Sequence, residues 1–211
     1  LVLDPEAGPY RSFAECWPRA GRGDTIEVAP GSYTELLLPR ASLFIRSRGG
    51  PEPTILDWES SHRIVQAEGI GLTFQGFTFQ HGRGGREGGA ILLDGDLTLT
   101  LRHCRFRENH TGSGINFARG GAVWTKGLCV IDSCRFVANG LQGSLDGAGG
   151  AVCARGGLRA THSTFLSNDG TLISALAAKP WIQVRNCIFV DRPGDAPRFT
   201  NAYDGSDTEC N

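Results

Sequence analysis

The chain has 211 residues, which is enough for one domain with a substantial core. Its 21 basic and 22 acidic residues leave a formal net charge of −1, and this balance argues against a general nucleic-acid-binding protein, because such a protein needs a basic face. Thirty residues are glycine, about twice the usual ~7% share, and the apolar runs are short. We therefore expect many tight turns and no membrane insertion.

The first 22 residues are predicted to form an N-terminal cap. Ser12 and Glu15 have the spacing of a capping box, in which two side chains satisfy free N–H groups at the start of a helix. Phe13, Cys16 and Trp17 share one face of such a helix. A short amphipathic helix here would cover strand edges that the first turn of the fold otherwise exposes.

Residues 23–70 contain short strands separated by turns. The segment GDTIEVAPGSY, residues 23–33, places Ile26 and Val28 on one side of a strand between two turns. The segment ASLFIRS, residues 41–47, repeats this alternation with Leu43 and Ile45. We interpret both segments as the first coils of the structure that the following repeat builds.

A repeat of 24 to 30 residues begins near residue 70 and is anchored on phenylalanines. Seven positions before each phenylalanine stands the first of two apolar residues spaced two apart, which is the periodicity of a strand. A small or polar turn residue separates that strand from the phenylalanine, and in three repeats an asparagine follows three positions later, before Gly-Gly-Ala opens a further strand. The repeated positions are Phe79, Phe106, Phe136, Phe165 and Phe189, the turn residues Gly76, His103, Ser133, His162 and Asn186, and the asparagines Asn109, Asn139 and Asn168.

This repeat predicts a right-handed parallel β-helix, an all-β solenoid in which each repeat forms one coil. Successive coils stack ~4.8 Å apart, so phenylalanine is expected to lie on phenylalanine and asparagine on asparagine. The Gly-Gly pair allows a sharp bend without a side chain in the corner. We expect one domain over residues 1–211, with the cap at 1–22, coils at 23–190 and an irregular tail at 191–211.

The combination of Gly-Gly-Ala-(Ile/Val) with Phe-x-x-Asn resembles the repeat of the chlamydial polymorphic outer-membrane proteins, and GDTIEVAPGSY is similar to the first coil of pectate-lyase-like β-helices. Together these motifs cover roughly residues 20 to 190. The resemblance implies a bacterial protein that is secreted or displayed at the cell surface, often as an adhesin. Its partner would then be a polysaccharide or a cell-surface protein. The same scaffold also carries polysaccharide lyases, hydrolases and epimerases, so the resemblance indicates a fold and leaves the activity open.

Three variable segments lie between the Phe-x-x-Asn and Gly-Gly-Ala motifs, at residues 82–87, 110–119 and 140–148. Insertions in a solenoid collect on one face, which is usually the binding face, so these loops are expected side by side along one edge. Arginines there suit the carboxylates of a uronic-acid polymer, and His or Glu suits acid–base chemistry, although exposed loops of any soluble protein are polar. The candidates for catalysis are Glu87, Glu108, His110 and Asp146, and those for ligand binding are His81, Arg83, Arg86, Asn116, Arg119, Trp124 and Lys126.

Trp124 and Lys126 follow the second Gly-Gly-Ala. If Val123 points inward, Trp124 points outward beside the loops, because side chains alternate along a strand. An exposed Trp in that place would stack on a sugar ring or anchor a protein partner. The alternative is that a loop covers it.

Cys104, Cys134 and Cys187 occupy the same repeat position, so we expect them to be stacked core residues rather than zinc ligands. No cofactor is predicted. Isolated Asp-Gly pairs form turns more often than ion sites. With that reservation, the candidates for a Ca²⁺ site are Asp94, Asp96, Asp204 and Asp207.

Three hypotheses about function follow from these residues. The leading one is a non-catalytic extracellular binding module whose loop edge contacts polysaccharide or a surface partner. The second is a polysaccharide-active enzyme that uses Glu87, Glu108 and His110 with Arg86 or Arg119 in the same groove. Glu87 and Glu108, in adjacent coils, are the best pair for the two facing carboxylates of a glycoside hydrolase. The third is a purely structural spacer.

Overall fold

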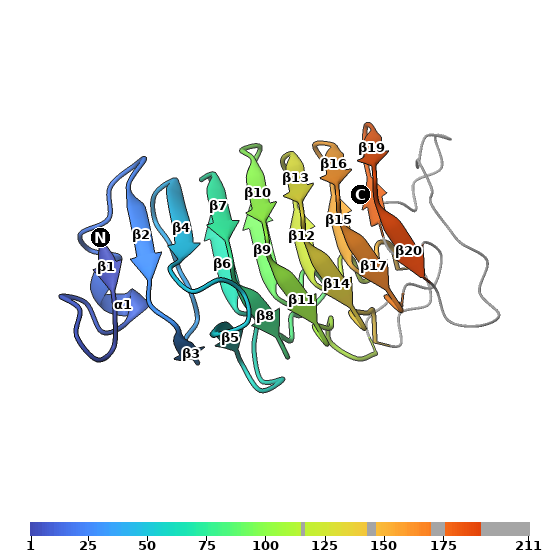
Figure 1. Ribbon diagram of the computed structural model, residues 1–211. Coiled ribbons are helices and arrows are strands. Elements are labelled where there is room, and N and C mark those ends of the chain that lie inside the picture. The colour runs from blue at the N-terminus through green and yellow to red at the C-terminus, as the bar shows by residue number, and fades with distance from the viewer. Residues whose placement is uncertain (115–116, 143–146, 170–175, 191–211) are drawn as a thin grey trace.

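The computed structural model describes residues 1–114, 117–142, 147–169 and 176–190. Within these ranges the chain winds into a solenoid whose strands form three parallel sheets, and the coils stack in chain order from one end to the other (Figure 1). The predicted all-β parallel β-helix is therefore confirmed. The predicted tail at 191–211 lies outside the described residues.

Each of the central coils adds one strand to each sheet. Sheet A consists of β1 (Val2–Leu3), β2 (Thr25–Val28), β4 (Leu43–Ser47), β7 (Leu72–Gln75), β10 (Leu99–Arg102), β13 (Cys129–Asp132), β16 (Leu158–Thr161) and β19 (Ile182–Arg185). Sheet B consists of β3 (Gly31–Tyr33), β5 (Thr54–Asp57), β8 (Thr78–Gln80), β11 (Arg105–Arg107), β14 (Arg135–Val137), β17 (Thr164–Leu166) and β20 (Ile188–Val190). Sheet C consists of β6 (Val65–Glu68), β9 (Ile91–Asp94), β12 (Val123–Thr125), β15 (Val152–Ala154) and β18 (Leu176–Ala178).

A single helical turn, α1 (Phe13–Cys16), lies at the N-terminal end of the solenoid (Figure 1). The Ser12 hydroxyl accepts the N–H of Glu15 at 3.3 Å, as the capping-box spacing predicts. Phe13 and Cys16 are fully buried in the main core, and the Trp17 ring stacks on Phe13 with centroids 5.4 Å apart. The predicted capping helix is confirmed.

An aromatic column on the inner side of sheet B sets the register between coils. Its rings lie nearly parallel, with neighbouring centroids 4.6–5.0 Å apart and interplanar angles of 1–9°. That separation is close to the ~4.8 Å between neighbouring strands, so each ring contacts its equivalent one coil away. Burial of each ring except the last, Phe189, which is only partly buried, contributes about 1.5–3 kcal/mol to folding. The column contains the predicted residues Phe79, Phe106, Phe136, Phe165 and Phe189.

An asparagine ladder closes the corner that follows sheet B. The side-chain Nδ2 of Asn109 donates to Oδ1 of Asn139 at 2.9 Å, and Nδ2 of Asn139 donates to Oδ1 of Asn168 at 2.8 Å. Each of these amides also donates to a main-chain carbonyl of the preceding coil, and each Oδ1 accepts a main-chain N–H from that coil. The ladder therefore satisfies buried backbone groups that the sheets leave unpaired.

The corner between sheets A and B uses the turn residues that the repeat indicated. These residues adopt left-handed backbone conformations with φ between 49° and 77°, which glycine and asparagine accept more readily than most residues. At Gly89 and Gly121, in the Gly-Gly-Ala motif, an added Cβ would collide with a carbonyl oxygen of the next coil. The turn residues with positive φ are Gly76, His103, Ser133, His162 and Asn186.

The predicted cysteine position is also a stacked one. The main-chain N–H of Cys104 donates to Sγ of Cys134 at 3.4 Å, and the N–H of Cys134 donates to the Ser163 hydroxyl at 3.0 Å. Cys104 and Cys134 are buried, and Cys187 is half-buried at the end of the column. These thiols are small core residues, as expected.

Candidate functional site

The three predicted loops lie side by side at the corner between sheets B and C. Their described parts pair in parallel through isolated bridges, Arg83 with His110 and His110 with Gly140 at one end of the loops. Glu87 pairs with Arg119, and Arg119 pairs with Ala148, at the other end. Asn116 and Asp146 lie outside the described residues. The predicted loop edge is therefore present in the parts of the loops that the structure describes.

One pair of opposite charges on this edge is joined across coils. The Arg119 guanidinium lies 3.3 Å from the Glu87 carboxylate, and both side chains are mostly buried. Arg83 donates to Oε1 of Gln142 at 2.8 Å, whereas Arg86 is exposed. Glu87 therefore forms an ion pair with an arginine of the next coil.

Trp124 does not project into solvent. Only 4% of it is exposed, because it packs with Ala148, Cys153 and Ala177 on the outer side of sheet C. The alternative in which the ring is covered is therefore correct, and Trp124 offers no surface for stacking on a sugar. Lys126 lies at the far end of β12 from the loops and is 3.7 Å from Asp96.

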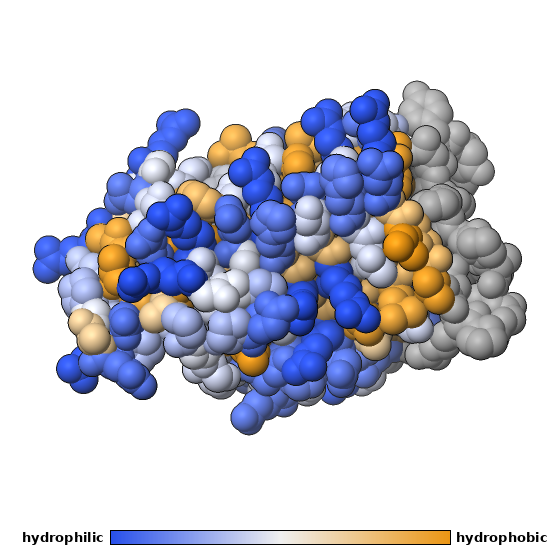
Figure 2. Space-filling model, viewed as in Figure 1, coloured by the Kyte–Doolittle hydropathy of each residue, from blue (hydrophilic) through white to orange (hydrophobic). Residues whose placement is uncertain are grey.

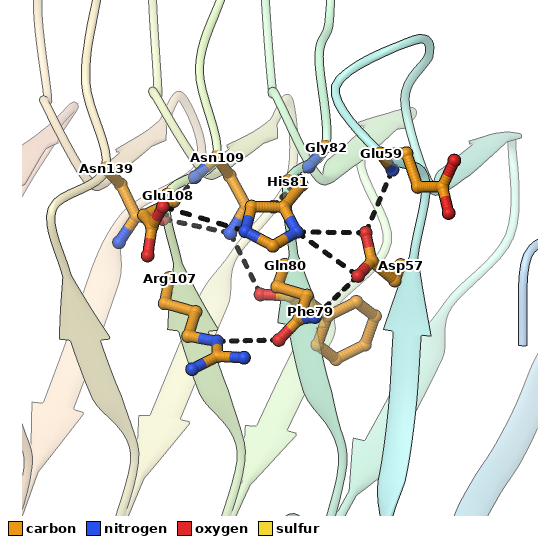
Figure 3. Close-up of polar contacts among 10 residues, drawn as sticks. All are labelled: Asp57, Glu59, Phe79, Gln80, His81, Gly82, Arg107, Glu108, Asn109 and Asn139. Atoms are coloured by element: carbon orange, nitrogen blue, oxygen red, sulfur yellow. Dashed lines mark hydrogen bonds and ion pairs between the residues drawn. The ribbon is translucent and has the colours of Figure 1, made fainter. Parts of the chain in front are cut away.

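His81 instead joins a polar cluster that begins one coil earlier, at Asp57 (Figure 3). The Nδ1 atom of His81 lies 3.1 and 3.2 Å from the two carboxylate oxygens of Asp57. Its Nε2 atom lies 3.6 Å from Oε2 of Glu108 in the following coil. The imidazole thus stands between two carboxylates, one from the preceding coil and one from the following coil.

Asp57 is held as a carboxylate by its hydrogen bonds. It accepts the main-chain N–H of Glu59 at 2.9 Å and the Gln80 amide at 2.5 Å, in addition to His81. Burial alone would raise the pKa of Asp57, but these hydrogen bonds outweigh burial and hold the pKa below its ordinary value. Asp57 was not among the residues predicted from the motifs. Extending the repeat one coil upstream would have identified Asp57. In that coil Leu56 lies opposite Phe79, and Asp57 lies opposite Gln80.

A shallow groove of about 410 Å³ runs over the outer face of sheet B. Because Phe106 and Phe136 point inward, their neighbours in β11 and β14 point outward into this groove. Figure 2 shows hydrophilic side chains over the middle of this face and apolar ones near β17 and β20. The polar residues that line the groove are Glu52, Thr78, Arg105, Arg107, Glu108 and Arg135. We call this surface the arginine groove.

Arg105 and Arg135 stand directly opposite each other in the register of β11 and β14. Like charges in such positions destabilise a sheet, whereas Arg46 on sheet A faces an acid, Glu27. Arg105 forms an ion pair with Glu52. Within the described part of the chain, no carboxylate forms an ion pair with Arg135. The groove therefore contains an arginine pair whose repulsion a bound anion would relieve.

A second groove, of about 450 Å³, shares Glu52, Arg105 and Arg135 and extends toward the corner between sheets A and B. At this corner Nδ1 of His162 lies 3.2 Å from Oδ1 of Asp132. The Thr161 hydroxyl donates to the same oxygen at 2.8 Å, and these contacts hold the pKa of Asp132 below its ordinary value. The two grooves flank the arginine pair on both sides.

The Ca²⁺ candidates do not form a cluster in the described ranges. Asp94 faces Glu68 in register, and Asp96 pairs with Lys126. Asp204 and Asp207 lie outside the described residues. Among the residues that the structure describes, no group of three or more His, Cys, Asp or Glu side chains is arranged to hold a metal ion. In the same ranges no helix has the length and apolar character to cross a membrane.

Comparison of the chain with protein-family models, with curated proteins and with solved structures found no match. The resemblance to polymorphic outer-membrane protein repeats and to pectate-lyase-like proteins remains a prediction from the motifs.

Proposed function

We propose that this protein is a non-catalytic binding module for an acidic polysaccharide and that the arginine groove on the outer face of sheet B is its main contact surface. The proposal keeps the binding hypothesis from the sequence and moves its centre from the loop edge to the adjacent sheet. It includes the predicted extracellular setting, in which such polymers are encountered.

The observation that carries the proposal is the in-register pair Arg105 and Arg135. Two guanidinium groups on adjacent coils present planar, fork-shaped donors that match carboxylate or sulfate oxygens. An acidic group placed between them would gain charge-assisted hydrogen bonds and would also remove the repulsion between the arginines. Arg107, whose Nε donates to Gln80 at 2.6 Å, adds a third guanidinium on the same face.

The shape of the groove also favours a polymer over a small ligand. It is open along the solenoid and joins the second groove through shared residues, so a chain could lie across several coils. Outside the arginine pair, the same column offers the Thr164 hydroxyl in the following coil. Thr78, in the preceding coil, is buried and donates to the Pro51 carbonyl. A cationic centre beside a hydrogen-bonding hydroxyl suits an acidic sugar with a neutral neighbour.

Binding of polyuronates, sulfated polysaccharides and neutral polysaccharides by isothermal titration calorimetry tests the proposal. Charge-assisted hydrogen bonds contribute about 1.5–3 kcal/mol each, so Arg135→Gln should weaken binding of the acidic polymer about 10- to 100-fold. Arg159→Gln is the matched control, because Arg159 is an exposed arginine on sheet A that faces Gln183. Equal losses in both variants, or binding of neutral polymers alone, would refute the assignment to sheet B.

The contacts of His81 support a second candidate, a polysaccharide-active enzyme. A carboxylate that hydrogen-bonds one ring nitrogen orients an imidazole for proton transfer at the other nitrogen, and Asp57 contacts Nδ1 in this way. Incubation of the polymers with the protein, with assays for unsaturated products and new reducing ends, separates the two functions. Turnover that is abolished by His81→Gln while binding persists would replace the binding module with the enzyme.

A further inference from the structure

A small cavity of about 240 Å³ lies at the base of the loops, beside the arginine groove. It is smaller than the ~300–1,000 Å³ pockets that hold drug-sized ligands, so it has room for one sugar unit and not for a longer chain. The side chains that line it are His110, Ala138, Leu141, Gln142, Ser167 and Asp169.

His110 contributes a buried ring nitrogen to this cavity. By hydrogen-bond geometry its Nδ1 atom has no partner within the described part of the chain. Burial lowers the pKa of His110 and outweighs the Gly140 backbone, Glu108 and Asp169, which raise it, and the nearby charge of Arg83 acts in the same direction as burial. The ring is therefore neutral near pH 7, and a neutral imidazole offers one donor and one acceptor, as a sugar hydroxyl does. Buried polar atoms without a partner are uncommon in folded proteins.

The corner between sheet B and the loops has small side chains next to this cavity. In successive coils the corner position is occupied by His81, Glu108, Ala138 and Ser167, all with φ between 50° and 54°. The side chains of His81 and Glu108 are large and belong to the polar cluster with Asp57. The side chains of Ala138 and Ser167 are small. Val137 lines the arginine groove and the next residue, Ala138, lines the cavity. We infer that a polymer can pass from one to the other over this small side chain.

We propose that this cavity is a second subsite, which takes an uncharged, hydroxyl-bearing sugar unit of the same polymer, with the polymer passing over Ala138 from the arginine groove. This inference rests on the proposed function and extends it to the composition of the ligand. A neutral unit fits because no arginine or lysine is among the described residues that line this cavity, so a second carboxylate would find no cationic partner there. The ligand class is therefore a polymer in which acidic and neutral sugars alternate.

The test uses two probes, a disaccharide and an octasaccharide in which a uronic acid alternates with a neutral, N-acetylated amino sugar. The octasaccharide is long enough to reach both sites, and the disaccharide reaches the arginine groove alone. Ala138→Gln fills the passage, and Glu108 shows that a side chain of this length is accepted at the same φ. Ala138→Ser is the matched control, because Ser167 occupies the equivalent position one coil later.

The expected result is a roughly tenfold loss of octasaccharide affinity in Ala138→Gln and in His110→Ala, with disaccharide affinity unchanged and Ala138→Ser equal to the wild type. Affinity that is equal for both probes in the wild type, or unaffected by Ala138→Gln and His110→Ala, would overturn the subsite and leave the arginine groove in place. Failure of the wild type to bind either probe would overturn both proposals. Far-ultraviolet circular dichroism of each variant checks the fold, and a loss of both affinities in a folded variant also counts against the subsite.

Discussion

The juxtaposition of Arg105 and Arg135 predicts an unusual result for a surface substitution. Replacing Arg135 by Gln should make the free protein more stable while weakening its binding to an acidic ligand. Most substitutions destabilise a protein, and surface ones usually change little. A gain in stability at the residue assigned to binding would indicate that this position is shaped for a ligand rather than for the fold.

The size of the effect follows from the separation of the two strands. Two unit charges about 5 Å apart in water repel by about 0.8 kcal/mol. Screening leaves about 0.7 kcal/mol of this at 10 mM salt, where the Debye length is about 30 Å, and about 0.2 kcal/mol at 1 M, where it is about 3 Å. Glu52 pairs with Arg105 and offsets part of the repulsion. We therefore expect Arg135→Gln to stabilise the protein by about 0.5 kcal/mol at low salt and by almost nothing at 1 M.

Urea unfolding followed by circular dichroism at both salt concentrations measures this difference, since urea, unlike guanidinium chloride, adds no charge. In a Glu52→Gln background the stabilisation by Arg135→Gln should grow, because the neutralising carboxylate is gone. Arg159→Gln serves again as the control and should show no comparable salt dependence. Destabilisation by Arg135→Gln at low salt, or a gain that persists at 1 M, would refute the reasoning.

Three further results are expected. Asn139→Ala should lower the free energy of unfolding, measured in urea titrations, by about 3 kcal/mol. The reason is that the substitution leaves the buried N–H of Asn109 and the carbonyl of Phe106 without their partners in the ladder. A loss below about 1 kcal/mol would contradict the role given to the ladder. The hydrogen bonds that lower the pKa of Asp57 stabilise the fold above the unfolded-state pKa of about 4, and this stabilisation is lost as the pH falls through the lower folded-state value. Stability measured from pH 7 to pH 2 should therefore fall less in Asp57→Asn than in the wild type, and an identical fall would count against these bonds. Of the unpaired cysteines in the described ranges, Cys187 should react first with iodoacetamide under native conditions. The others are buried, and burial raises the pKa of Cys129 to about 12. If mass spectrometry finds that Cys129 is labelled as fast as Cys187, this packing is excluded.

The architecture could be predicted from the sequence because a solenoid repeats a few positions under the same constraint. A phenylalanine that must stack on its equivalent leaves a clear period, as Phe106 and Phe136 do. The turn positions were visible for a similar reason, since only some residues accept a positive φ such as that of Asn186. Both signals are local, and both recur in register.

The candidate site was harder to predict because it does not recur. Arg105 and Arg135 flank the inward phenylalanines, and the register that places them opposite each other was already available in the sequence. The prediction placed the site in the inserted loops, where Glu87 and Arg119 neutralise each other. Alternation gave the direction of Trp124 correctly, but it carries no information on whether the outer side of a sheet is covered.

A crystal structure of the protein with a bound acidic oligosaccharide tests the central claim most directly. The account predicts an acidic group between the guanidinium groups of Arg105 and Arg135, with the chain on the outer face of sheet B. An oligosaccharide bound only on sheet A, on sheet C or at the Glu87–Arg119 pair would contradict it.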